Sequence, residues 1–313
     1  MNEPPRDDIA IDVEGLTKIF DGKTVVRNLT LRLARARIHG FLGPNGSGKT
    51  TTIRMLCGLL TPDAGRGSCL GYDILTQREQ IRRHVGYMTQ RFSLYEDLTI
   101  TENLEFVARI YGMPDPQGAA RGAIVRLGLQ ARAHQLAGQL SGGWKQRLAL
   151  GACVLPEPLL LLLDEPTAGV DPKARRDFWD EIHDFAAQGM TVLVSTHYMD
   201  EAERCHDIAY IAYGDLLAQG TAEEIIDASG LHTFTVTGAD LHALQRKLGE
   251  DKRVEMVAPF GAALHVAARE KSALDAVADE NRAGYRWTPD APTLEDAFIA
   301  LMNGAHNGEG KAA

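Results

Sequence analysis

The stretch GPNGSGKTT at residues 43–51 brings glycines, one cation and several hydroxyl groups together. It fits the spacing G-x-x-x-x-G-K-[ST], in which glycines let backbone N–H groups approach phosphate oxygens. The strand-like segment RIHGFLG precedes it, and KTTTIRMLCGLL follows with the character of a buried helix, whose N-terminus adds partial positive charge. We therefore predict a cradle for nucleotide phosphates, formed by Gly43, Asn45, Gly46, Ser47, Gly48, Lys49, Thr50 and Thr51.

A metal site is predicted beside this cradle. Lys49 would neutralise the β and γ phosphates, and Thr50 offers a hydroxyl to Mg²⁺. The segment LLLLLDEPT is typical of a buried parallel strand, which would deliver Asp164 to the carboxyl edge of the sheet, where ligands of such folds bind. A carboxylate at that edge can hold the Mg²⁺ that bridges the phosphates.

Three further side chains are candidates for catalysis. Glu165 follows Asp164 directly and could accept a proton from an attacking water or orient it, although a solvated charge at a strand end is the alternative. His197 ends the next strand, TVLVS, and could donate a hydrogen bond to the γ-phosphate. Gln90 closes the apolar segment HVGYM, and its amide can contact both metal and water.

The stretch LSGGWKQR at residues 140–147 predicts a second anion site. Ser141 is a good helix N-cap, and Gly142 and Gly143 expose backbone N–H groups ahead of the helix. A free helix N-terminus attracts anions. A single nucleotide does not obviously need two phosphate-binding features.

The elements that must position these residues form two domains. From Ile9 to about Gly230, short apolar segments alternate with helical patterns, which predicts a mostly parallel sheet covered by helices. The central strands are expected at RIHGFLG, LLLLLDEP, TVLVSTH and IAYIAYG, and a helical subdomain at about 92–155. Residues 231–313 have the order β-α-β-β-α-β with a trailing helix, which predicts a small α+β domain of ferredoxin-like order beside the first domain, residues 1–230.

Composition excludes several classes of function. The chain has 42 Asp and Glu against 33 Lys and Arg, and a net charge of -9 argues against a surface that coats nucleic acid. Four irregularly spaced cysteines indicate free thiols in a reducing compartment, with neither a zinc site nor a disulfide framework. The start MNEPPRDDIA lacks the pattern of a secretory signal, and no apolar run approaches the ~20 residues that span a bilayer. We expect a cytosolic protein that reaches a membrane only through a partner.

The order of the motifs resembles the ATP-binding cassette (ABC) family. The glycine loop, Gln90, LSGG, LLLLLDEP, AGVDP and STH appear in that family's order and cover about residues 9–230. The resemblance implies a P-loop NTPase cassette with antiparallel N-terminal strands, which binds and hydrolyses ATP with Mg²⁺. LSGG in particular argues against a GTPase or a small-molecule kinase.

The resemblance also implies roles that spacing alone does not give. Family members enclose two ATP molecules between two head-to-tail cassettes, so Ser141, Gly142 and Gly143 would contact the γ-phosphate bound in the partner subunit. Phe20 would stack on adenine, with core packing as the alternative, and Asp171 would couple the two sites. Gln90 would link hydrolysis to motion of a membrane partner.

The tail resembles cassettes of drug, antibiotic and polysaccharide exporters, specifically at PTLEDAFIALM. Trp144 stands where the common signature has Gln, as in exporter variants. The implied protein is a homodimeric ATPase subunit beneath two permease chains, at the cytoplasmic face of the membrane. Its permease groove would include Phe92, Leu94 and Tyr95, for which core packing is the alternative.

Two other functions stay open. The chain could be a soluble ABC-type ATPase in translation, DNA repair or cofactor assembly. The single cassette, the acidic charge and the absence of a long heptad insertion count against this function. It could also be a regulatory module that binds nucleotide without turnover, which Glu165 counts against.

Overall fold

The computed structural model describes residues 8–309, so most of the N-terminal segment used to judge secretion lies outside it. The chain divides into two compact units, Met1–Leu216 and Leu217–Ala313, each of which is described by itself. The division comes before the boundary expected at residue 230, because α8 (Ala222–Ser229) packs against α11 (Leu294–Glu309) of the C-terminal unit. Across residues 8–309, no helix is both long and apolar enough to cross a bilayer.

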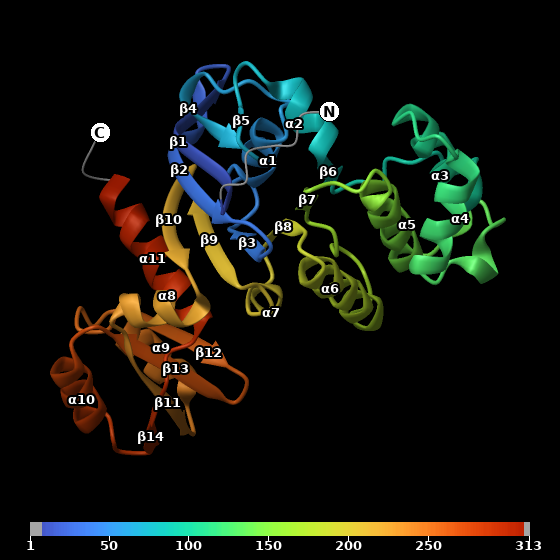
Figure 1. Ribbon diagram of the computed structural model, residues 1–313. Helices are drawn as coiled ribbons and strands as arrows, with labels where there is room; N and C mark the ends of the chain where they lie inside the picture. Colours follow the sequence, from blue (N-terminus) through green and yellow to red (C-terminus); the bar gives the residue numbers. More distant parts are fainter. Residues whose placement is uncertain (1–7, 310–313) are drawn as a thin grey trace. The chain divides into compact units, whose positions relative to one another are not determined.

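A six-stranded sheet forms the centre of the N-terminal unit (Figure 1). The strand pairings from β9 to β6 are parallel, and β3, β7 and β8 are buried throughout, which explains their continuous apolar sequences. The four expected central strands are therefore confirmed. In spatial order, the strands are β10 (Asp215–Gly220), which runs past the division at Leu216, β9 (Asp207–Ala212), β3 (Ile38–Leu42), β8 (Thr191–Thr196), β7 (Leu160–Asp164) and β6 (Val85–Met88).

The register of this sheet brings three loops to one edge. Leu42 of β3 pairs with Thr196 of β8, and Asp164 of β7 pairs with Ser195 of β8. Because parallel strands end on the same side, the residues that follow β3, β7 and β8 emerge together. This edge is where the predicted phosphate loop, Asp164 and His197 were expected to meet.

An antiparallel sheet packs beside the central one, as the resemblance implied. Its core cluster joins Leu29, Ile53 and Leu162, so α1 (Lys49–Leu56) is fixed by apolar contacts with both sheets. The short helix α2 (Arg78–His84) leads into β6. The antiparallel strands, in spatial order, are β2 (Lys23–Ala34), β1 (Ile9–Phe20), β4 (Ala64–Cys69) and β5 (Tyr72–Asp73).

The helices of the expected helical subdomain share a core of their own, which includes Leu104, Ile124 and Leu148. A capping box at Thr99 starts its first helix, and the Asp115 side chain caps the second. Its elements are α3 (Ile100–Ile110), α4 (Pro116–Arg126), η1 (Gln130–Arg132), η2 (Ala137–Gln139) and α5 (Gly142–Val154). The chain then returns to the sheet, where α6 (Pro172–Ala187) buries Phe178 and Trp179 and the short α7 (Met199–Ala202) follows β8.

The C-terminal unit contains the expected β-α-β-β-α-β order and the trailing helix. Its four strands form an antiparallel sheet in the order β12-β13-β11-β14, over a core that includes Val236, Leu244 and Leu274. The elements are β11 (His232–Gly238), α9 (Leu241–Gly249), β12 (Met256–Phe260), β13 (Ala263–Ala268), α10 (Lys271–Glu280) and β14 (Tyr285–Asp290), followed by α11.

All four cysteines are free thiols, as expected. Burial raises the pKa of the Cys57 thiol to about 11 and that of Cys153 to about 12, and it also raises the pKa values of Cys69 and Cys205. Thiols with such pKa values are protonated at neutral pH and therefore react slowly.

Candidate functional site

The loop between β3 and α1 requires its glycines. Gly43 and Gly48 have φ values of 155° and 104°, in the region that side chains disfavour. A Cβ atom on Gly43 would lie 1.9 Å from the carbonyl oxygen of Ile211, and one on Gly48 would lie 2.8 Å from that of Val25. The loop therefore closes against the backbones of β9 and β2.

Lys49 is held across this loop. Its Nζ donates hydrogen bonds to the carbonyl oxygens of Gly43 at 2.7 Å and Pro44 at 3.1 Å, and lies 3.4 Å from Glu165 Oε1. Burial lowers the pKa of the Lys49 ammonium, and the nearby Glu165 carboxylate opposes that shift. A bound phosphate would supply the negative charge that this buried ammonium needs.

Asp164 and Glu165 are oriented by Ser195 of the neighbouring strand. The Ser195 hydroxyl donates to Asp164 Oδ1 at 2.7 Å and accepts the backbone N–H of Glu165 at 3.0 Å. Glu165 has a φ of 47°, which is uncommon outside glycine and stores backbone strain of about 1 kcal/mol. The strand thus ends in an enforced turn at the second carboxylate.

Glu165 is the centre of a cluster drawn from four loops. Gln90 Nε2 donates to Glu165 Oε2 at 3.1 Å, and His197 Nδ1 lies 3.4 Å from the same oxygen. With Lys49 on the other oxygen, every side chain expected to act in catalysis meets at Glu165. The solvated-charge alternative is wrong for Glu165, because the residue is 9% exposed.

A cavity of about 230 Å³ adjoins this cluster. Sequence reasoning missed Val25, which belongs to the antiparallel sheet, and Ser195, whose only signal was a hydroxyl near the end of the strand TVLVST. The cavity is lined by Val25, Asn45, Gly46, Gly48, Lys49, Thr50, Thr51, Gln90 and Glu165.

Two residues expected near the nucleotide have further explanations in the structure. Phe20 ends β1 with 44% of its surface exposed, and the Lys18 ammonium lies 5.4 Å from its ring centroid, so core packing is wrong for Phe20. The Asp171 carboxylate caps α6 by accepting the backbone N–H groups of Lys173 and Ala174 at 3.1 and 3.0 Å. Their contacts with nucleotide stay predictions.

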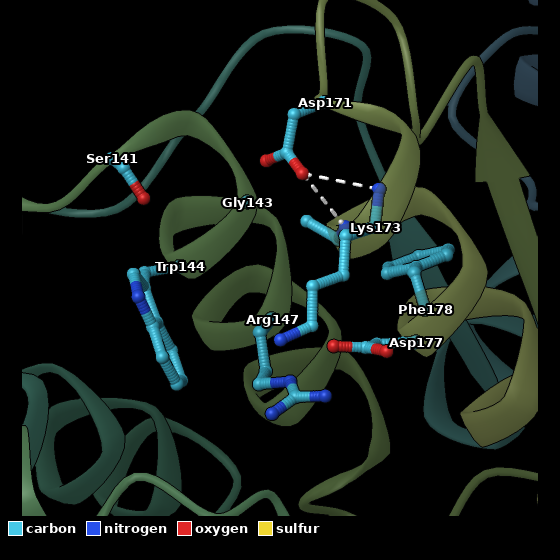
Figure 2. Close-up of a pocket in the computed structure, with 9 residues that line it drawn as sticks. Ser141, Gly143, Trp144, Arg147, Asp171, Lys173, Asp177 and Phe178 are labelled. Carbon is cyan, nitrogen blue, oxygen red and sulfur yellow. Dashed lines mark hydrogen bonds between the residues drawn. The ribbon is translucent and has the colours of Figure 1, made fainter.

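The serine-glycine motif lines a second cavity, of about 200 Å³, between the starts of α5 and α6 (Figure 2). Ser141 occupies the N-cap position, but its hydroxyl makes no capping hydrogen bond, so the expected cap is only positional. A Cβ atom on Gly143 would lie 2.6 Å from that of Ala174, so the glycine allows the two helices to approach. This cavity shares no lining residue with the one at Lys49.

Trp144, which takes the place of the common Gln, lies close to two cations. The guanidinium carbon of Arg132 lies 4.8 Å from its ring centroid, and that of Arg147 lies 5.4 Å away. Arg147 also pairs with Glu181 of α6 at 2.7 Å. Through Arg132 and Arg147, Trp144 thereby connects the serine-glycine motif to the helical subdomain and to α6.

The residues expected to form a permease groove are divided. Phe92 and Leu94 are half-buried and pack against the core of the helical subdomain, in agreement with the packing alternative. Tyr95 is 53% exposed, with the ring of Phe106 edge-on at 5.1 Å. Tyr95 and Phe106 therefore present an aromatic surface.

Comparison with known proteins identifies the family. A family model described as ABC transporter matches residues 26–168. The chain is 37% identical over 300 residues to Nod factor export ATP-binding protein I of Ralstonia nicotianae, and the match covers 93% of each protein. The chain belongs to the ATP-binding subunits of ABC exporters. Like other ABC subunits, it is an ATPase that hydrolyses ATP for transport.

Two further matches support the ABC assignment. The chain is 42% identical over 220 residues to the probable multidrug ABC transporter ATP-binding protein YbhF of Escherichia coli, in a match that covers 69% of this chain but 38% of YbhF. The structure of cbiO1 from Clostridium perfringens, described as part of the ABC transporter complex cbiONQ, has a TM-score of 0.64 at 26% identity. That match covers 71% of this ABC subunit and 92% of cbiO1.

Proposed function

We propose that this chain drives export through a separate membrane permease by hydrolysing Mg-ATP between two cassettes. The observation that carries the proposal is the cluster of Lys49, Gln90 and His197 around Glu165, beside the glycine loop. A lone phosphate-binding loop would serve many nucleotide proteins. The carboxylate and its neighbours add the groups that turnover needs.

The residues present suit a magnesium ion. Thr50, Asp164 and Gln90 supply hydroxyl, carboxylate and amide oxygens, which are the hard ligands that Mg²⁺ prefers. Among the described residues, Ser195 engages one Asp164 oxygen and leaves the other for a ligand. Gln90 likewise contacts Glu165 through its amide nitrogen, not its oxygen. When bound, Mg²⁺ would neutralise charge on the phosphates.

Glu165 and His197 have different roles in ATP hydrolysis. The Glu165 carboxylate orients the attacking water and accepts its proton. His197 donates a hydrogen bond to the γ-phosphate, and its position 3.4 Å from Glu165 keeps donor and base adjacent. Lys49 and the backbone N–H groups of the glycine loop hold the phosphate chain in place.

The second cavity fits a contact made across a dimer. Ser141 has a hydroxyl that its own helix does not use, and Gly142 and Gly143 leave the start of α5 accessible. Because this cavity is separate from the one at Lys49, we assign the motif to the nucleotide held by a second, identical subunit. Asp171, at the start of α6, lines the same cavity and would couple the two sites.

The partners follow from the family and from the exposed surface. The relative cbiO1 is described as part of a transporter complex, and Nod factor export ATP-binding protein I is named for export. A permease would place this chain at the cytoplasmic face of the membrane, with Tyr95 and Phe106 in the contact. The C-terminal unit would be a ferredoxin-like accessory domain, since its sheet order is β12-β13-β11-β14.

Purification from native membranes tests the proposal. The full chain, carrying an affinity tag, is expected to recover a polytopic membrane protein in stoichiometric amount. The recovered complex should hydrolyse ATP only when Mg²⁺ is present. Recovery of ribosomes or DNA without a membrane protein would instead support a soluble ABC-type ATPase.

A further inference from the structure

Glu201 is a fully buried carboxylate that none of the roles above uses. It lies on α7, four residues after His197, and has 0% of its surface exposed. A buried ionisable group destabilises the fold unless it is hydrogen-bonded or paired. Its Oε1 accepts a hydrogen bond from the Thr167 hydroxyl, while Oε2 has no hydrogen-bond partner in the described part of the chain.

Thr167 connects Glu201 to the catalytic carboxylate. It is 1% exposed and lies two residues after Glu165, at the start of the loop that leads to Asp171 and α6. Its hydroxyl therefore reaches from the loop after β7 to the helix after β8. Glu165 and His197, the residues that directly follow β7 and β8, both belong to the candidate reaction centre.

Arg175 of α6 completes the connection. Its Nε lies 3.6 Å from Glu201 Oε1, and its guanidinium carbon lies 4.4 Å from the ring centroid of Tyr198. The ring of Tyr198 lies in turn 4.1 Å, centroid to centroid, from that of His197. Glu201 thus joins the loop after β7, the loop after β8 and the first turn of α6.

The sheet alone does not fix this geometry. The parallel ladder between β7 and β8 ends with the pair Asp164 and Ser195, and a further backbone bond runs from Glu165 N–H to the Ser195 carbonyl at 3.1 Å. His197 lies beyond the ladder. A contact outside the ladder must therefore hold the His197 ring against Glu165.

We propose that Glu201 is a positioning residue for ATP hydrolysis, which sets the separation of Glu165 and His197 through its contacts with Thr167 and Arg175. The inference rests on the proposed function, since it concerns the same reaction centre. Glu201 would touch neither nucleotide nor metal. Its loss should therefore slow the chemical step without weakening nucleotide binding.

The test uses the full chain and changes single atoms of the contact. Thr167→Val removes the hydroxyl at nearly constant volume, and Thr167→Ser keeps it. We expect kcat to fall about 10- to 100-fold in Thr167→Val, with KM and ATP affinity unchanged, and to recover in Thr167→Ser. Glu201→Gln should show a smaller loss of kcat, because Gln can still accept the hydrogen bond.

Asp200→Asn is the matched control. Asp200 is the neighbour of Glu201, and its carboxylate also lies 3.7 Å from Arg175, but its side chain is 64% exposed. We expect wild-type kcat in this variant. The double variant Thr167→Val with Glu201→Gln should lose no more than Thr167→Val alone, because Thr167→Val already removes the hydrogen bond that Glu201→Gln weakens.

The outcomes separate the inference from the function on which it rests. Wild-type kcat in Thr167→Val, a loss of ATP affinity equal to the loss of kcat, or a failure of Thr167→Ser to recover would overturn the role of Glu201. A wild-type chain that hydrolyses no ATP, alone or with its permease, would overturn the proposed function instead. Should Thr167→Val not fold, Glu201→Gln takes its place: a lower kcat with unchanged ATP affinity would support the inference, and wild-type kcat or an equal loss of ATP affinity would overturn it.

Discussion

The Lys49 ammonium lies 3.4 Å from Oε1 of Glu165. Lys49, which is expected to bind phosphate, therefore contacts Glu165, the expected base for ATP hydrolysis. Burial disfavours the charged form of Lys49, and Glu165 restores part of the lost stabilisation. A triphosphate entering the glycine loop would take over that role and free the carboxylate for water.

Replacement of Glu165 by Gln should separate binding from turnover. The amide keeps the size of the side chain but cannot accept the proton of water, so hydrolysis should fall at least about 100-fold while ATP binding persists. Gel filtration with Mg-ATP should then show an accumulated dimer. Undiminished phosphate release from Glu165→Gln would refute the assignment of the base.

Lys49→Ala should weaken nucleotide binding. The variant removes the cation that lies across the loop, and we expect ATP affinity to fall about tenfold or more, since charge-assisted bonds to phosphate are strong. Titration calorimetry with ATP measures this loss. Lys252→Ala, an exposed lysine of the C-terminal unit, is the control and should bind as the wild type does. Equal affinities in the two variants would contradict the phosphate cradle.

Ser141→Ala should leave the stability of the chain unchanged. N-cap substitutions usually cost about 1 kcal/mol, but the Ser141 hydroxyl makes no capping bond. Thr99→Ala is the matched change, because Thr99 forms a complete capping box on α3, and it should lower the free energy of unfolding by about 1 kcal/mol. Urea unfolding compares the two, and a loss in Ser141→Ala as large as in Thr99→Ala would show that the hydroxyl serves its own helix.

Glu181 should make stability depend on pH. Burial raises the pKa of this carboxyl from 4.5 to about 7, while Arg147 opposes the shift. Between pH 4.5 and 7, the folded chain therefore holds a proton on Glu181 that the unfolded chain releases. The stability that this proton gives the fold is complete below pH 4.5 and is lost as the pH rises through 7. The change in pKa corresponds to about 3 kcal/mol.

Unfolding of wild type and Glu181→Gln from pH 5 to 8 measures this contribution. The free energy of unfolding of the wild type should decline relative to that of the variant as pH rises. Glu203→Gln, at an exposed glutamate, should follow the wild type at every pH. Parallel curves for wild type and Glu181→Gln would mean that Glu181 titrates as it does in the unfolded chain.

The local sequence was sufficient to predict residues that act through their own backbone or that lie at the end of a strand. The spacing of Gly43 and Gly48 and the strand ending at Asp164 depend on neighbours along the chain, so both could be predicted. Ser195 and Glu201 could not, because their contacts come from strand register and from the loop after β7. Ser141 lies at the predicted N-cap position, but its hydroxyl makes no capping bond, because N-cap preference gives the position of a residue and not the direction of its hydroxyl.

The separation of the cavity at Lys49 from the cavity at Ser141 has a consequence for kinetics. If one triphosphate must touch both, an isolated chain holds two halves of different reaction centres and no complete one. Specific activity would then increase with protein concentration until all chains are in dimers. An inactive variant mixed into the sample would lower the activity of the wild-type chains in proportion to the fraction of dimers that contain it.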